Sequence, residues 1–355
     1  MANNVDPDQM KELGYKVWSY KMGELVSLMI HFGDSLGIYS AMAGKGPLTS
    51  TQVAETAGLS ERVVREWLLG QAAAGLVDRS PDGQFELNAA QAAFLANESD
   101  SIVFAGGAFG GGTPTETVEA LADSFRTGRG ITYEQQGPSR AASLARMTGP
   151  WSRLALVDLI LPALDGVVDK LEAGATVIDV GCGGGVTAIT IAKAFPASTV
   201  TGYDPSQTAI DLARSNAEGV DNVSFEVAAG ESIDPDASVD LAITFDCLHD
   251  MARPDQTSAA IHQAVAPEGT WLVKEIRSSG SFEKNLRNPM LAMLYGYSIS
   301  SCLQSSLSQP DGLGLGTVGL HPEAMEDLVK AAGFSTIKKH DFEDPSNLYY
   351  EIRNI

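Results

Sequence analysis

The chain has 355 residues, 44% hydrophobic and 19% charged, which suits a folded protein of about two domains and excludes a wholly disordered chain. Its 24 basic and 45 acidic residues give a net charge of −21, which disfavours nucleic acid and anionic membranes as partners. No stretch approaches the roughly 18 consecutive apolar residues of a membrane span, and the polar N-terminus lacks a secretory pattern. Three scattered cysteines (Cys182, Cys247 and Cys302) are too few for a disulfide framework, so we expect a cytoplasmic protein.

The first third of the chain predicts short helices. One is expected from Asp34 to Met42, and Thr49 with Gln52 forms a capping-box pattern that begins a helix over 50–56. Gly58 ends that helix, and a further helix is expected after it. Its apolar face is made by residues at helical spacing, namely Val63, Val64, Trp67 and Leu68.

A hairpin is predicted next, from two stretches, 75–79 and 84–87, that flank the turn residues of 80–83. Helix, turn, helix and hairpin in this order predict a winged helix, a fold that often binds DNA. Between Thr49 and Glu98, however, the sequence has three basic and seven acidic residues, a net charge of −4. Because a DNA-binding module needs clustered Lys and Arg, DNA binding is the less favoured hypothesis.

From Ala173 onward, apolar strand-like runs alternate with amphipathic helical patterns. The expected strands cover 176–180, 199–203, 223–227, 240–245 and 270–275, and two of the expected helices cover 186–195 and 206–217. This alternation predicts an α/β, Rossmann-like fold, in which a parallel, doubly wound sheet is covered on both faces. In such folds ligands bind along the edge where the strands end.

The strongest local pattern is the run Val177-Ile178-Asp179-Val180-Gly181-Cys182-Gly183-Gly184-Gly185. Glycines between a strand and a helix let the backbone approach a ligand, and Asp204, at the end of the next strand, is placed to bind ribose hydroxyls. A dinucleotide fingerprint needs glycine where Val186 stands, and a carboxylate at Asp179 would repel a pyrophosphate. S-adenosylmethionine, with an ammonium group and no phosphate, fits better. A purely structural turn with a capping aspartate is the alternative.

With the later turn Pro267-Glu268-Gly269-Thr270, this segment resembles the class I S-adenosylmethionine-dependent methyltransferases over roughly 173–355. The resemblance implies that Asp179, Gly181 and Gly183 hold the methionine end of the cofactor and that Asp204 binds the ribose. It also implies a role along the adenine for the stretch at Gly230 and Glu231. The full set of expected cofactor contacts is Asp179, Gly181, Gly183, Asp204, Pro205, Gly230, Glu231 and Phe245.

The run Leu248-His249-Asp250-Met251, behind a winged helix, resembles small-molecule O-methyltransferases and also bacterial winged-helix methyltransferases that are often labelled transcriptional regulators. The resemblance implies that His249 is the general base and that Glu275 orients it. A histidine is suited to this role near neutral pH, although a buried, satisfied polar residue is the alternative. Met251 replaces the tryptophan of that motif. His321 could act as a second acid or base, but its place before a helix start favours a capping role.

We therefore expect a winged-helix dimerisation domain (1–98), a helical linker and substrate cover (99–172) and a cofactor-binding methyltransferase domain (173–355). The reaction expected is methyl transfer to a hydroxyl of a small, largely apolar metabolite, with Trp151, Met251 and Tyr297 lining the acceptor site and no metal. The resemblance also implies a homodimer. A cofactor-responsive regulator without turnover, and a methyltransferase for N, S or C acceptors, are the alternatives.

Overall fold

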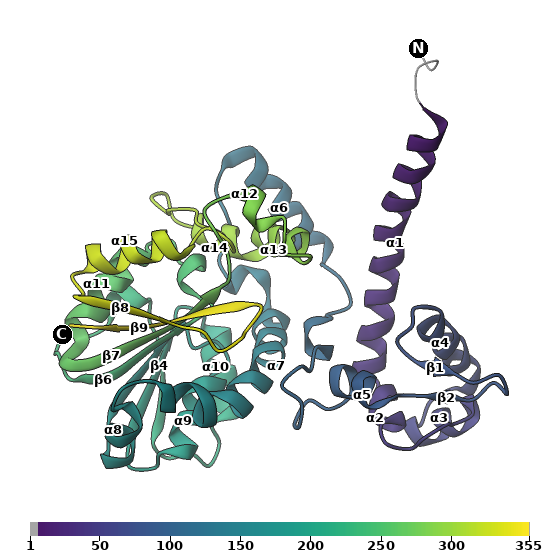
Figure 1. Cartoon of the computed structure of the whole chain (residues 1–355), viewed down its shortest axis with the longest axis horizontal. Helices are drawn as coiled ribbons and strands as arrows, with labels where there is room; N and C mark the ends of the chain where they lie inside the picture. The colour runs from purple at the N-terminus through teal and green to yellow at the C-terminus, as the bar shows by residue number, and fades with distance from the viewer. Residues whose placement is uncertain (1–5, 355) are drawn as a thin grey trace. The chain divides into compact units, whose positions relative to one another are not determined.

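The computed structural model describes residues 6–354 (Figure 1). The chain forms two compact units, one ending at Thr113 and the other beginning at Pro114. Within the described residues, no helix has both the length and the apolar character needed to cross a membrane.

The first unit is a helical domain with a short hairpin. Its elements are α1 (Pro7–Ser35), α2 (Ile38–Met42), α3 (Ser50–Ala57), α4 (Glu61–Ala73), β1 (Asp78–Arg79), β2 (Phe85–Glu86), α5 (Ala89–Leu95) and the 3-10 turn η1 (Gly106–Ala108). The predicted capping box is confirmed, because Thr49 and Gln52 bond each other's backbone N–H. Gly58 ends α3 with a φ of +68°, a left-handed value that glycine adopts without strain.

The structure of this unit differs from the sequence predictions in three ways. The sequence does not predict the 29-residue helix α1, which begins at Pro7 and covers the start of the helix expected from Asp34 to Met42. That expected helix is broken, because Gly37 adopts a φ of +68° between α1 and α2. Val63 does not belong to the apolar face of α4; it is 68% exposed, whereas Val64, Trp67 and Leu68 are buried.

The second unit begins with helices that precede the sheet. They are α6 (Thr115–Thr127), the 3-10 turn η2 (Glu134–Gln136), α7 (Pro138–Ala155), the π-helix η3 (Leu156–Ile160), the 3-10 turn η4 (Leu161–Ala163) and α8 (Val167–Ala173). The remaining helices lie between or after strands. They are α9 (Val186–Ala194), α10 (Gln207–Asn216), η5 (Gly230–Ser232), η6 (Leu248–Asp250), α11 (Pro254–Ala264), α12 (Phe282–Asn285), α13 (Leu291–Tyr297), η7 (Ser298–Cys302), α14 (Leu303–Ser306) and α15 (Pro322–Ala332).

A seven-stranded sheet forms the centre of this unit, in the order β5-β4-β3-β6-β7-β9-β8. Its strands are β3 (Thr176–Val180), β4 (Thr199–Asp204), β5 (Val223–Val227), β6 (Val239–Phe245), β7 (Val265–Ile276), β8 (Thr336–His340) and β9 (Asn347–Arg353). The five strands predicted from the sequence are parallel to one another. The sheet as a whole is mixed rather than parallel, because β9 pairs antiparallel with both β7 and β8.

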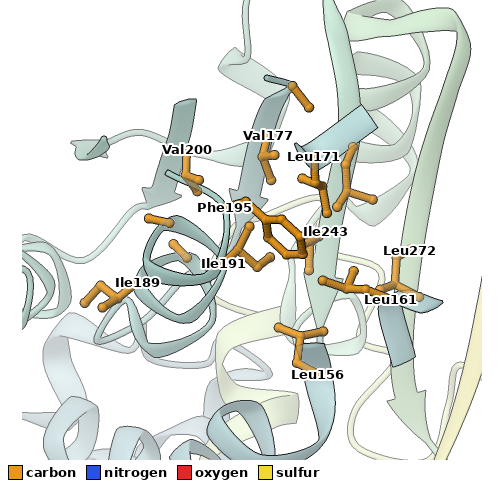
Figure 2. Close-up of a cluster of buried hydrophobic side chains, with 14 of the residues drawn as sticks. Leu156, Leu161, Leu171, Val177, Ile189, Ile191, Phe195, Val200, Ile243 and Leu272 are labelled. Carbon is orange, nitrogen blue, oxygen red and sulfur yellow. The ribbon is translucent and has the colours of Figure 1, made fainter. Parts of the chain in front are cut away.

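Both faces of the sheet are covered, which confirms the doubly wound, Rossmann-like expectation. Side chains alternate along β3, so Val177 joins the core beneath α8 and α9 while Ile178 joins the core beneath α11 and α15. Figure 2 shows the first of these cores, in which Ile191 of α9 and Leu171 of α8 lie near Val177. Because β3 to β7 run parallel, their carboxyl ends lie along one edge of the sheet.

Candidate functional site

The backbone conformation of the loop after β3 depends on its glycines. Gly181, Gly183 and Gly185 adopt φ values of +76°, +53° and +76°, which side-chain-bearing residues rarely adopt. A Cβ on Gly181 would lie 2.8 Å from the Cys247 Sγ, so this position has no room for a side chain. The space around Gly183 is open, which leaves the loop backbone accessible from that side.

Asp204 holds this loop in place from the end of β4. Its Oδ2 accepts a hydrogen bond from the Gly183 backbone N–H at 3.0 Å, and its Oδ1 accepts one from the Ser206 N–H at 2.9 Å. Burial raises the pKa of Asp204, while these two hydrogen bonds act in the opposite direction. The carboxylate therefore joins the glycine loop to the start of α10.

Asp179 is buried at the end of β3, with 2% of its surface exposed. Its Oδ2 has no hydrogen-bond partner. Burial raises the pKa of Asp179 to about 7, nearby Asp204 adds to the rise, and the backbone N–H of Ala188 opposes it. An unpartnered buried carboxylate oxygen beside the loop is suited to a cationic ligand group.

The other four residues predicted to contact a cofactor, which are Pro205, Gly230, Glu231 and Phe245, lie in different surroundings. Pro205 and Glu231 are exposed, whereas Gly230 is buried where a Cβ would meet Thr257. Glu231 borders a surface hollow beside α11. Phe245 is half-buried, and its ring meets that of Trp151 edge-on at 5.5 Å.

The predicted acceptor residues lie in three places. Trp151 stacks on Tyr349 with ring centroids 5.7 Å apart, and the Lys274 Nζ lies 4.4 Å from its ring. The Met251 Cε lies 3.8 Å from the position that a Cβ on Gly181 would take, so Met251 is beside the glycine loop. Tyr297 is half-buried at the end of α13.

His249 lies in η6, directly beyond β6, with 2% of its surface exposed. Its Nδ1 lies 2.6 Å from the Glu275 Oε2, and the Glu275 Oε1 accepts from the backbone N–H of Leu248 at 3.1 Å. Glu275, at the end of β7, therefore holds both the imidazole ring of His249 and the backbone directly before it. Burial alone would lower the pKa of His249, but Glu275 and Asp250 raise it well above its ordinary value.

Three further residues belong to the group around His249, and sequence reasoning did not assign them to the site. The Asp250 Oδ1 lies 3.1 Å from the His249 Nε2, the Tyr133 hydroxyl donates to the Asp250 Oδ2 at 2.6 Å, and the Cys302 thiol contacts the imidazole. Asp250 was visible beside His249 in the motif. Tyr133 and Cys302 come from segments 116 and 53 residues away along the chain, and no local pattern marks them.

Residues 133–136, here called the strap, join this histidine cluster to the start of α10. Tyr133 bonds Asp250, whereas the neighbouring Glu134 accepts hydrogen bonds at 2.5 Å from the Ser206 Oγ and at 2.7 Å from the Thr208 hydroxyl. These bonds hold the pKa of Glu134 below its ordinary value. Gln136 accepts from the Ser301 hydroxyl at 2.8 Å. The strap therefore contacts the histidine cluster and the segment that follows Asp204.

Replacing Tyr133 with phenylalanine is expected to lower the free energy of unfolding by about 1–3 kcal/mol, because it leaves a buried carboxylate oxygen of Asp250 without its hydrogen bond. Burial and Asp250 raise the pKa of Tyr133 well above its ordinary value, so the hydroxyl remains a donor at every working pH. Denaturant unfolding measures the loss. Tyr295→Phe, at a ring that is 37% exposed, is the control, and equal stabilities for the two variants would contradict the expectation.

His321 caps a helix, as the sequence favoured. Its Nδ1 accepts from the backbone N–H of Ala324 at 3.4 Å, at the start of α15. A Cβ on Gly280 would lie 3.1 Å from the His321 ring, so the ring packs closely against that glycine. His321 is therefore a helix cap in this structure.

Comparison with known proteins matches both units. A family model described as "Methyltransferase domain" matches residues 171–308, and one described as "Rv2258c-like winged HTH domain" matches residues 24–97. A release factor glutamine methyltransferase from Rhodopirellula baltica is 39% identical over 64 residues, which are 18% of this chain and 22% of that protein. The chain thus spans about a fifth of the length of this curated relative.

Solved structures match the whole fold. Human N-acetylserotonin methyltransferase, solved in complex with S-adenosylmethionine, is 18% identical with a TM-score of 0.69 and full coverage of both chains. A putative O-methyltransferase from Nostoc punctiforme is 19% identical with a TM-score of 0.69, and the match covers 99% of this chain and 100% of that one. These likenesses establish the fold of the chain.

Proposed function

We propose that this chain, which carries a methyltransferase domain behind an N-terminal winged helix-turn-helix domain, is an enzyme that uses S-adenosylmethionine to methylate a hydroxyl of a small, largely apolar metabolite. The observation that carries the proposal is the buried His249–Glu275 pair, at the same sheet edge as the glycine loop and Asp179. The domain match and the fold support the reaction class, and the site supports the acceptor atom.

The residues at the glycine loop fit S-adenosylmethionine. The unpartnered Asp179 Oδ2 is suited to the ammonium group of the methionine end, and the open backbone at Gly183 admits close approach. Asp204, oriented by its two backbone hydrogen bonds, retains lone pairs for ribose hydroxyls. When bound, the cofactor supplies a sulfonium methyl group, which is transferred in line to a nucleophile.

The role of His249 is to take the proton of the acceptor hydroxyl on its Nε2 as the oxygen gains the methyl group. Glu275 holds the opposite ring nitrogen, so the Nε2 is the nitrogen available to a substrate. Since the imidazole is only 3% exposed, an acceptor reaches the Nε2 only when the packing around it opens. The contacts of the strap with Asp250 and with the start of α10 place it beside that opening.

A matched set of acceptors tests the assignment to oxygen. Phenols, the corresponding anilines and the corresponding thiols are incubated with the protein and methyl-deuterated S-adenosylmethionine, and mass spectrometry detects the labelled product. We expect product from members of the phenol series, with one equivalent of S-adenosylhomocysteine. Methylation of anilines or thiols in preference to phenols would contradict the hydroxyl acceptor, while leaving methyl transfer in place.

The affinity for S-adenosylmethionine is expected to rise roughly eightfold from about pH 6 to about pH 7.5, because only the ionised Asp179 attracts the ammonium group. Its pKa of about 7 places the change in this range: below it the carboxyl is neutral, and above it the charge is present. Calorimetric titration at several pH values measures the effect. In Asp179→Asn the affinity is expected to be lower and flat with pH, and an unchanged slope would contradict this role.

A homodimer formed through the first unit is part of the proposal. Leu13, Tyr15 and Trp18 on α1 are 61–70% exposed, and a second copy of the chain would cover them. Light scattering is expected to give twice the chain mass, and Trp18→Glu is expected to shift the protein toward monomer. A wild-type monomer at micromolar concentration would contradict the dimer.

Cytoplasmic residence fits the three free cysteines. The charges of the winged helix argue against duplex DNA as a partner, since Arg62 pairs with Glu66 and Arg65 with Glu61 along the same helix face.

A further inference from the structure

The geometry around His249 points to a second ligand for the same cluster. We propose that the His249 Nε2, the Asp250 Oδ1 and the Cys302 Sγ form a binding site for one Zn²⁺-class ion, and that the bound ion inhibits methyl transfer. One ligand atom from each of the three residues lies within 4.8 Å of the other two, and all three residues are buried. One imidazole, one thiolate and one carboxylate match the ligands of three-coordinate protein zinc sites that keep a fourth position open.

The Asp250 Oδ1 provides an independent indication of a missing ligand. It lies 3.1 Å from the His249 Nε2, yet it is buried and receives no hydrogen bond. Around a tetrahedral Zn²⁺, nitrogen and oxygen ligands lie about 3.3 Å apart, as follows from bonds of roughly 2.0–2.1 Å. The two atoms are thus close to the separation that a shared ion sets.

The outer contacts of the cluster also match a metal site. Glu275 accepts from the His249 Nδ1 at 2.6 Å, which leaves the Nε2 as the ligating nitrogen, as in carboxylate–histidine–zinc arrangements. Tyr133 donates to the Asp250 Oδ2 at 2.6 Å, which orients the carboxylate with its Oδ1 toward the cluster. Cys302 ends the π-helix η7, an irregular turn type that occurs often at functional sites.

Binding and inhibition follow from simple chemistry. The ion binds the Nε2 and the Cys302 thiolate, and the thiol proton, with any proton on the Nε2, passes to the solvent. With its Nε2 occupied, His249 cannot accept the proton of an acceptor hydroxyl. The inhibition rests on the proposed function, whereas the binding does not. The cofactor loop takes no part, so S-adenosylhomocysteine is expected to bind equally well with and without the ion.

The test uses the full chain after chelator treatment, with Co²⁺ as a spectroscopic probe for the Zn²⁺ site. We expect one equivalent of Co²⁺ to give a thiolate-to-cobalt charge-transfer band, which Zn²⁺ removes by competition. Cys302→Ser and Cys302→Ala are expected to lose the band, while the matched control Cys182→Ser keeps it. Circular dichroism confirms that each variant is folded. A wild-type protein without the band, or a Cys302 variant that retains it, would overturn the site.

Activity separates the two parts of the proposal. With an acceptor identified, one equivalent of Zn²⁺ is expected to lower turnover at least tenfold and chelator to restore it, while the affinity for S-adenosylhomocysteine changes less than twofold. Turnover that is unchanged or raised by saturating Zn²⁺ would overturn the inhibition. If no acceptor is methylated at all, the proposed function fails, and the cobalt spectra still decide whether the metal site exists.

Discussion

Replacing His249 with glutamine is expected to lower turnover by roughly 100- to 10,000-fold, the range that a positioned general base contributes. Glutamine keeps an uncharged polar side chain at this position but has no basic nitrogen, so the base beside Glu275 is lost. The affinity for S-adenosylmethionine is expected to change no more than a few-fold, because His249 does not belong to the glycine loop. Initial rates and calorimetry on the same preparation measure the two effects separately.

The matched control is His321→Asn, since asparagine also caps helices and His321 serves as the N-cap of α15. Its turnover is expected to stay within about twofold of wild type. A His249→Gln enzyme with near-normal turnover would exclude the base role and favour an acceptor that needs no deprotonation.

The pH dependence of turnover gives a second measure of this histidine. The carboxylates of Glu275 and Asp250 raise the pKa of His249 above its ordinary value of about 6.5, so turnover is expected to fall on the acid side at a pH above that value. Glu275→Gln removes one of these charges and is expected to move the acid limb to lower pH. If the acid limb of Glu275→Gln stays at the wild-type pH, the group that titrates there is not His249.

Replacing Asp204 with alanine is expected to weaken the binding of S-adenosylmethionine at least 100-fold. The variant removes the group placed for the ribose, and it also removes two hydrogen bonds that hold Gly183 and Ser206. The rise in melting temperature on adding S-adenosylhomocysteine, large for wild type and absent for the variant, measures the loss.

Asp211→Ala is the control for this substitution, because Asp211 lies on the neighbouring helix α10 with its side chain 64% exposed. It is expected to keep the ligand-induced rise in melting temperature. An Asp204→Ala protein with the full rise would show that the loop holds the cofactor without this carboxylate.

The sequence predicted the elements whose pattern is local. The strand at 176–180 matches β3, because its apolar residues are buried on both faces between a polar start and a glycine turn. The capping box at Thr49 and Gln52 was predictable for the same reason, since both partners lie within one helical turn. The methyltransferase-domain model matches residues 171–308, a range that includes the glycine loop.

What the sequence did not predict depends on contacts between distant segments. The strand β9 turns antiparallel only because it returns to pair with β7, about 75 residues earlier in the chain. Helix α1 shows no burial-driven periodicity, since most of its side chains are exposed. Tyr133, through its bond to Asp250, and Cys302 join the group around His249 from the strap and the π-helix, so only the folded chain shows that they share a site.

Calorimetric titration of the purified wild-type protein with S-adenosylmethionine, S-adenosylhomocysteine and NAD tests the central claim most directly, because it needs no knowledge of the acceptor. We predict micromolar, one-to-one binding of the first two and no binding of NAD. Binding of NAD alone, or of none of the three, would contradict the assignment of Asp179, the glycine loop and Asp204 to S-adenosylmethionine.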